Sequence, residues 1–347
     1  MIKVSMKQKE YPIDFVVTWL DSTDPEWIKD YNKYKGISSV GDQSVARFRD
    51  WDLFQFWFRA VEEYAPWVNK VFLVTNGTFP KWINSHHPKL VLVKHSDYIP
   101  AQYLPTFNSR TIELNLHRIK GLSEHFVYFN DDTYINAPVS PEYYFKKGLP
   151  CDCNIEKIFY SPIYSHQNKF HTSISQYCNI AVLNHHFNRQ DVVKHSWRRW
   201  YGKHLGLKGV LISLLQFRKD TFEGFLWRHN EQSFLKSVFE EAWNQEKQML
   251  NHSCTRFRQD VSLNPYFMRY WQFATNRFYP RNLDTFKFYP IIESHYQEIL
   301  SAINNSNIKS LCLNDTPLCS YDFYEKMCPV LHKKLEEKFP HKSSFEE

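Results

Sequence analysis

Three polar residues, Asn130, Asp131 and Asp132, directly follow a run of mostly apolar residues, 125–129 (HFVYF). A buried strand that ends in a pair of acids would place two carboxylates at the carboxyl edge of a sheet, where open α/β sheets bind their ligands. Adjacent carboxylates are hard oxygen donors suited to Mg²⁺ or Mn²⁺, which in turn hold phosphate oxygens. The alternative is a simple β-turn, because Asn-Asp-Asp is also favourable turn chemistry.

Two pairs of arginines stand one residue apart, far from each other in the sequence. The first pair lies in Arg47-Phe48-Arg49-Asp50, and the second in Thr255-Arg256-Phe257-Arg258. Guanidinium groups bind phosphate oxygens in a bidentate manner, so the first pair could clamp a diphosphate, with an exposed charge cluster as the alternative. The second pair would bring positive charge from the helical half of the chain.

A third group of polar residues runs from Asn108 and Ser109 through Glu113 to His117 and Arg118. We expect a helix over 109–120, in which Glu113 and His117 would share one face. His117 could then act as a general base or contact a phosphate. An ordinary polar helix surface is the alternative.

Asp21 and Asp24 follow another apolar run, 13–20 (IDFVVTWL). In an enzyme that uses nucleotide sugars, this position would meet the nucleotide. The alternative is the capping of a helix, and Asp24 before Pro25 fits that role well.

The elements that would position these residues alternate between strands and helices. Strands are predicted at 13–20, 71–76, 90–95 and 125–129, and helices at 52–64 and 109–120. This order is typical of an α/β fold whose parallel or mostly parallel sheet has helices on both faces.

The pattern changes after residue 140, so we divide the chain into an α/β portion (1–140) and a second portion (141–347). Residues 139–205 look irregular, and helices are predicted over 230–249, 264–275 and 321–339. We expect the second portion to pack against the first and to close over the carboxyl edge of the sheet.

Composition limits the class of protein. The 347 residues carry a net charge of only +6, which suits an anionic ligand but is too small to indicate nucleic acid binding. The seven cysteines are scattered without a CxxC pair, so we expect reduced thiols in a cytoplasmic protein. The sequence has no signal-peptide pattern and no run of about 18 apolar residues, which predicts at most peripheral contact with the inner face of a membrane.

Long segments of this chain resemble the Stealth family of sugar-1-phosphate transferases. The resemblance occurs in four blocks: 13–27; 47–83 with 104–135; 255–280; and 311–316 with 338–346. It implies a GT-A-like nucleotide-sugar fold with a mainly helical second portion. It also implies the transfer of a hexose-1-phosphate from a UDP-sugar donor to a glycan or lipid-linked oligosaccharide acceptor, with release of UMP. A conventional glycosyltransferase that releases UDP is the nearest alternative, and a carbohydrate-binding protein without turnover is a further one.

The resemblance also assigns expected roles to residues of this chain. Asp131 and Asp132 match the acidic pair implicated in binding Mg²⁺ (or Mn²⁺). The expected catalytic residues are Asp21, Asp50, His117, Arg118, Arg256 and Arg258, with His117 or Asp21 as the proton acceptor. The expected substrate-binding residues are Arg47, Asn108, Ser109, Glu113 and Asn130.

Overall fold

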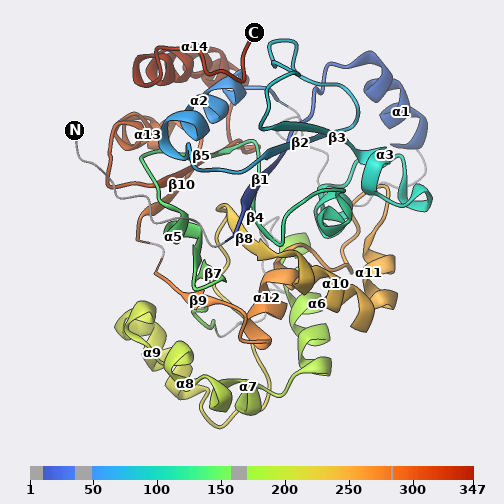
Figure 1. The fold of residues 1–347 in the computed structure, drawn as a ribbon, viewed down its shortest axis with the longest axis vertical. Helices are drawn as coiled ribbons and strands as arrows, with labels where there is room; N and C mark the ends of the chain where they lie inside the picture. Colours follow the sequence, from blue (N-terminus) through green and yellow to red (C-terminus); the bar gives the residue numbers. More distant parts are fainter. Residues whose placement is uncertain (1–10, 36–48, 158–169, 283) are drawn as a thin grey trace.

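A five-stranded sheet forms the centre of the computed structural model, which describes residues 11–35, 49–157, 170–282 and 284–347 (Figure 1). The strand order is β3-β2-β1-β4-β8. The first four strands are parallel, and β8 runs antiparallel to β4. Their bounds are Ile13–Thr18 (β1), Val71–Thr75 (β2), Leu90–Lys94 (β3), His125–Phe129 (β4) and Gln232–Leu235 (β8). The expected α/β class with a mostly parallel sheet is confirmed.

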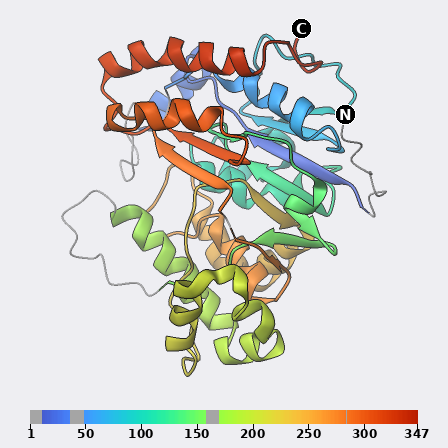
Figure 2. The same cartoon turned by 90° about the vertical axis from the view of Figure 1, so that its left-hand side faces the viewer.

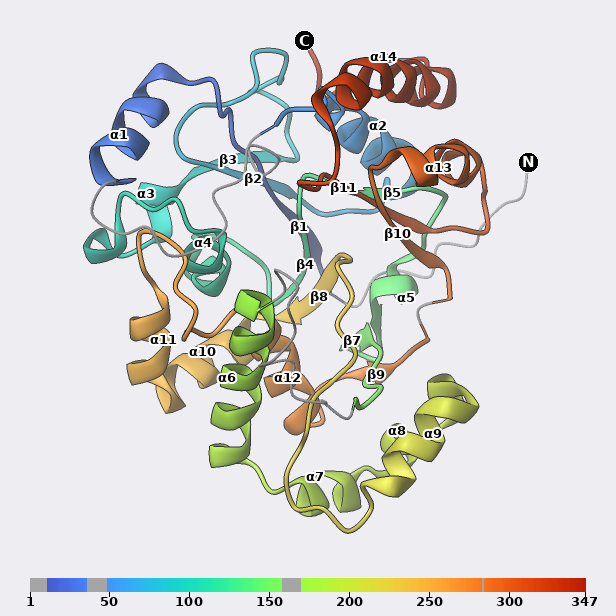
Figure 3. The same ribbon diagram turned by 180° about the vertical axis from the view of Figure 1, so that it is seen from behind.

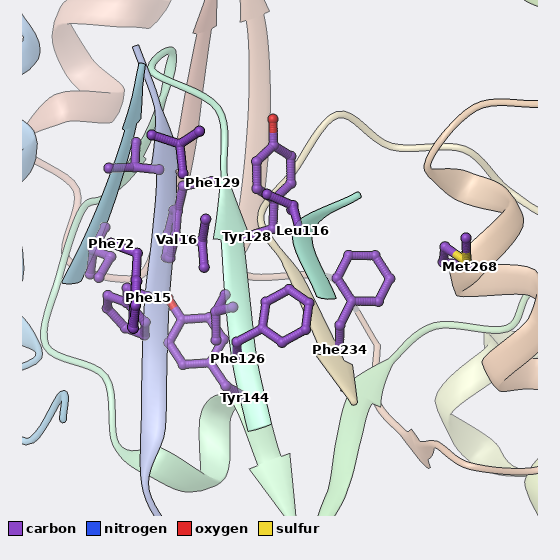
Figure 4. Packing of buried hydrophobic residues seen from close by; sticks show 14 of the residues in the cluster. Phe15, Val16, Phe72, Leu116, Phe126, Tyr128, Phe129, Tyr144, Phe234 and Met268 are labelled. Atoms are coloured by element: carbon purple, nitrogen blue, oxygen red, sulfur yellow. The ribbon is translucent and has the colours of Figure 1, made fainter. Parts of the chain in front are cut away.

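Both faces of the sheet are covered, which explains why its inner strands are apolar without alternation. On one face, the Phe129 ring lies 5.0 Å from Phe15 and 5.4 Å from Trp57 of helix α2 (Phe54–Tyr64). On the other face, the Phe126 ring lies 5.7 Å from Phe234 (Figure 4). It lies equally far from Phe239.

Helices form a layer on each side of this sheet. Figures 1 and 3 show helices above it and below it. The upper helices are α2, α13 (Tyr296–Ile303) and α14 (Tyr321–Lys338), and the lower ones are α10 (Lys236–Gln245), α11 (Lys247–Ser253) and α12 (Tyr266–Ala274). Further helices are α1 (Pro25–Lys35), α3 (His95–Tyr98), α4 (Ser109–Leu114) and α5 (Pro141–Tyr144).

The chain beyond residue 140 completes the sheets. Besides β8, it supplies β10 (Phe286–Pro290) and β11 (Ser310–Asn314), and β11 pairs with β5 (Thr133–Ile135). The short strands β6 (Phe145–Lys146), β7 (Leu149–Asp152) and β9 (Tyr279–Pro280) form a further sheet. One apolar core extends through both portions, so residue 140 does not separate two cores.

The expectation of irregular structure over 139–205 is wrong for most of its described residues. The segment contains α6 (Phe170–His186), α7 (Arg189–His195) and α8 (Trp197–Trp200), followed by α9 (Gly206–Leu215). These helices project from the lower side of the molecule (Figure 2). Asparagine and histidine have low helix propensity, but a buried ion pair holds the segment: Arg189 Nε lies 2.7 Å from Glu156 Oε1.

All seven cysteines are free thiols, as expected, and five of them are buried. Within the described residues, no helix combines the length and the apolar character needed to cross a membrane.

Candidate active site

A cleft of about 950 Å³ opens where β1 and β4 end, at the edge that the sequence predicted. Both portions of the chain line it. The first portion contributes Trp19, Asp50, Ser109, Glu113 and Asn130 to Asp132; the second contributes Trp227 to Asn230, Arg258, Tyr266, Phe288 and Asn314. Residues of the second portion therefore line the cleft at the carboxyl edge of the sheet.

Asp131 presents its carboxylate to this cleft. Desolvation by the surrounding protein, and then the negative charges of Asp132 and Asp50, raise the pKa of Asp131 to about 7. The same kind of crowding acts on Asp50, whose pKa is raised by desolvation and by the charges of Asp52 and Asp21. Several carboxylates therefore lie close together in the cleft, and a cation between them would reduce their mutual repulsion.

Asp132 is held in place by residues of the second portion. Its Oδ2 accepts hydrogen bonds from Asn314 Nδ2 at 2.9 Å and from His229 Nε2 at 3.2 Å, and its Oδ1 accepts one from Thr133 at 3.1 Å. Burial alone would raise the pKa of Asp132, but His229 and these hydrogen bonds lower it overall. Burial lowers the pKa of His229, and the charge of Asp132 more than reverses this. Each group therefore favours the charged form of the other.

The donor atoms in the cleft fit a hard divalent ion. Carboxylate oxygens of Asp131, Asp132 and Asp50 are ligands that Mg²⁺ and Mn²⁺ prefer. Asp132, His229 and Cys312 also offer an oxygen, a nitrogen and a sulfur within 4.8 Å of one another. Within this group, His229 Nε2 also lies 3.2 Å from Asp132 Oδ2.

Helix α4 brings a second group of residues to the cleft. Asn108 caps the helix by accepting a hydrogen bond from the backbone N–H of Arg110 at 3.1 Å. Ser109 Oγ then accepts a hydrogen bond from the Arg258 guanidinium at 2.7 Å. Glu113 lies one turn further on, where burial raises its pKa to about 7 although the charge of Arg258 opposes this. Asn108 therefore acts on the cleft through the helix it caps.

The structure does not bring His117 or Arg118 to the cleft. The predicted helix 109–120 ends at Leu114 and is followed by a 3₁₀ turn over Leu116–Arg118, so Glu113 and His117 do not share a face. Burial and the charges of Arg118 and Lys236 lower the pKa of His117 to about 3, and its ring packs against Trp243.

The two arginines of the second pair have different surroundings. Arg258 lines the cleft. Arg256 points elsewhere: its Nε donates to the carbonyl of Pro105 at 3.0 Å, and its guanidinium lies 4.0 Å from the centre of the Tyr34 ring. In extended backbone, residues two apart would point to the same side, but the chain bends at Arg256 and Phe257, so the two side chains take different directions.

The remaining predicted residues have different surroundings. Asp50 lines the cleft, whereas the carboxylate of Asp21 accepts hydrogen bonds from Thr23 at 2.6 and 2.9 Å. Asp24 caps helix α1 by accepting a hydrogen bond from the Glu26 N–H at 2.9 Å, so the capping alternative holds for it. Arg47 lies outside the described residues.

Sequence reasoning missed residues that the second portion contributes. His229 is the most important of them, and the others are Arg228, Asn230, Gln232, Asn264, Tyr266, Lys287 and Asn314. His229 is one of sixteen histidines. Its only sequence signal is the polar run Arg228–Gln232 that leads into a strand, and this run does not show that the strand pairs with β4.

Comparison with known proteins identifies similar chains. Residues 47–151 match the family model of the Stealth protein CR2, conserved region 2. The capsular polysaccharide phosphotransferase WcwK of Streptococcus pneumoniae is 38% identical, over 98% of this chain and 99% of that protein. The receptor polysaccharide phosphotransferase WefC of Streptococcus oralis is 35% identical, over 96% of this chain and 99% of that protein.

Among solved structures, the galactosyltransferase LgtC in complex with donor and acceptor sugar analogues is similar at a TM-score of 0.38 and 9% identity. The match covers 93% of this chain and 95% of that one. This likeness concerns the fold alone and says nothing about the chemistry.

Proposed function

We propose, from the premise that this chain belongs to the Stealth family of phosphotransferases, that it transfers a hexose-1-phosphate from a UDP-sugar to a hydroxyl of a glycan acceptor. The observation that carries the proposal is the 38% identity to a capsular polysaccharide phosphotransferase over 98% of the chain. The cleft supports it, because acids suited to a divalent ion face Arg258 and His229 across one space.

The proposed reaction is attack on phosphorus. The acceptor oxygen forms a bond to the β-phosphorus of the donor, and the bond between that phosphorus and the oxygen of UMP breaks. The bond between the sugar carbon and its oxygen stays intact, so the anomeric configuration is retained. The products are a phosphodiester and UMP.

Negative charge develops on the phosphoryl oxygens and on UMP, and the chain holds cationic groups to meet it. Arg258 is oriented by its hydrogen bond to Ser109, and His229 is kept charged by Asp132. Asp131 and Asp132 would hold Mg²⁺ (or Mn²⁺), which when bound supplies further charge stabilisation. Fixed charges in a protected site are the largest recurring contribution to phosphoryl transfer.

Glu113 is the group best suited to take the proton from the acceptor hydroxyl. Its pKa of about 7 matches the working range of a general base, and it lines the same cleft as Arg258. His229 is less suited to this step because its pairing with Asp132 favours the protonated form. The sequence also suggested His117 and Asp21 as proton acceptors. The His117 ring packs against Trp243 outside the cleft, and the Asp21 carboxylate accepts a hydrogen bond from Thr23.

The experiment is to incubate the protein with a panel of UDP-sugars, Mg²⁺ and glycan acceptors, and to identify the nucleotide that is released. UMP together with a phosphodiester product supports the proposal. UDP together with a glycoside would mean attack on the sugar carbon and a conventional glycosyltransferase. An Asp131→Asn variant should release neither, which controls for contaminating enzymes.

We also propose that the protein works in the cytoplasm. The support is its seven free cysteines, because oxidising compartments favour disulfides. Recovery from the periplasm or the medium with disulfides formed would refute this location.

A further inference from the structure

Helix α9, Gly206–Leu215, exposes apolar side chains to solvent. Leu207 is 80% exposed, Leu211 53%, Leu214 52% and Leu215 74%. These four residues are spaced i, i+4, i+7 and i+8, so they form one stripe along the helix. Phe217, which is 62% exposed, follows directly. We call these five residues the α9 patch.

The opposite side of α9 is made of small residues. Gly209 and Ser213 are the buried positions of this helix. A Cβ atom on Gly209 would lie 2.9 Å from Leu205 Cβ and 3.5 Å from Ile155 Cγ1, so the glycine allows close contact with the rest of the protein. A helix of a globular protein normally buries its leucines and exposes its small and polar residues. The reversed arrangement indicates that the leucines have an apolar partner beyond the residues that the structure describes.

The charges around the α9 patch indicate the chemistry of this partner. No aspartate or glutamate occurs between residues 194 and 218. The exposed charged side chains of this stretch are all basic: Lys194, Arg198, Lys203, Lys208 and Arg218. Exposed Trp197 lies on the neighbouring helix α8, and tryptophan favours the boundary between lipid and water. Two copies of the chain joined through this patch would bring like charges together, whereas an anionic lipid surface matches both the apolar stripe and the charges.

We propose that the α9 patch docks the protein on an anionic membrane, with α9 lying in the plane of the lipid headgroups. A helix of 10 residues is about 15 Å long, half of the roughly 30 Å needed to cross the hydrocarbon layer. Figures 1 and 2 place α9 at the far end of the molecule from α14, where it can meet a flat surface. This inference does not depend on the proposed reaction.

The test is flotation of the full chain with vesicles, without donor or acceptor. Wild type should bind vesicles that contain phosphatidylglycerol and bind pure phosphatidylcholine vesicles more weakly. Each buried leucine accounts for about tenfold in partitioning, so Leu207→Ser with Leu211→Ser should bind about 100-fold more weakly. The matched control is Leu318→Ser, because Leu318 is 79% exposed but lies outside the α9 patch. This control should bind like wild type.

A charge-reversed variant separates the electrostatic contribution. Lys203→Glu with Lys208→Glu should remove the preference for phosphatidylglycerol. None of these variants should alter nucleotide release with a water-soluble acceptor, so failure of the docking proposal and failure of the proposed reaction give different results. The proposal would be overturned if the wild type does not bind anionic vesicles, or if the leucine variants bind them like wild type. Sedimentation showing a wild-type dimer that the leucine variants convert to monomer would also overturn it, since a second copy would then cover the α9 patch.

Discussion

His229 Nε2 lies 3.2 Å from Asp132 Oδ2, and this contact joins the two portions of the chain across the cleft. Asp132 follows β4, whereas His229 precedes β8, which pairs antiparallel with β4. The pairing of these two strands therefore sets the distance between the acid and the imidazole. Because each group favours the charged form of the other, the contact favours a protonated imidazole of His229 at the acidic edge.

Replacing His229 should impair catalysis more than folding. We expect His229→Ala to lower kcat by about 10²- to 10³-fold, because a charge aimed at the phosphoryl group is lost. His185, exposed on α6, provides the matched control, and His185→Ala should retain full activity. Steady-state kinetics and thermal unfolding would check this. Wild-type kinetics for His229→Ala would remove the residue from the reaction.

Activity should require a divalent ion at the acidic pair. We expect EDTA to abolish turnover and Mg²⁺ or Mn²⁺ to restore it. Asp131→Asn should abolish turnover in the presence of Mg²⁺ without loss of stability, because it relieves repulsion with Asp132 and Asp50. Asp30→Asn, on the exposed side of α1, is the control and should behave like wild type. Full turnover in chelator would contradict the metal's role.

Alanine substitutions of the neighbouring arginines Arg256 and Arg258 should have different effects: one should lower stability and the other should lower activity. Arg258→Ala should raise the barrier by about 2–3 kcal/mol, measured as a loss of kcat/KM, with an unchanged melting temperature. Arg256→Ala should instead destabilise the protein by about 1–3 kcal/mol, because the carbonyls of Leu104 and Pro105 lose their donor. Kinetics and urea unfolding of both variants decide the assignment, and the reverse pattern would show that it is wrong.

Buried His117 should make stability depend on pH. Its folded-state pKa of about 3 lies below its usual value of 6.5, so between these values the unfolded chain binds a proton that the folded chain does not. Stability is therefore lost as the pH falls below about 6.5, by roughly 1.4 kcal/mol per pH unit from this residue.

Urea unfolding at pH 5, 6 and 7 would measure this contribution, with His117→Gln as the variant that lacks it. The variant should show a shallower loss of stability on acidification and nearly unchanged kcat at pH 7.5. If His117→Gln instead shows a large fall in kcat and an unchanged dependence of stability on pH, His117 is again a candidate for the general base.

Much of the first portion could be predicted from the sequence because its signals are local. The strands at 13–20, 71–76, 90–95 and 125–129 are apolar runs bounded by polar turns, and each lies within one or two residues of its predicted end. The region 230–249 shows where such signals fail. Its first residues form β8 because they pair with β4, and only the later ones are helical, as α10 and α11.

The sequence by itself determined the acidic pair, the α/β class and the edge of the sheet where the site lies, since each follows from residues adjacent in the chain. The tertiary structure decided which polar residues share that edge. It selected Arg258 over Arg256 and Glu113 over His117, and it added His229. These choices depend on the direction in which side chains leave a backbone and on strand pairing between distant segments, and neither is encoded in local spacing.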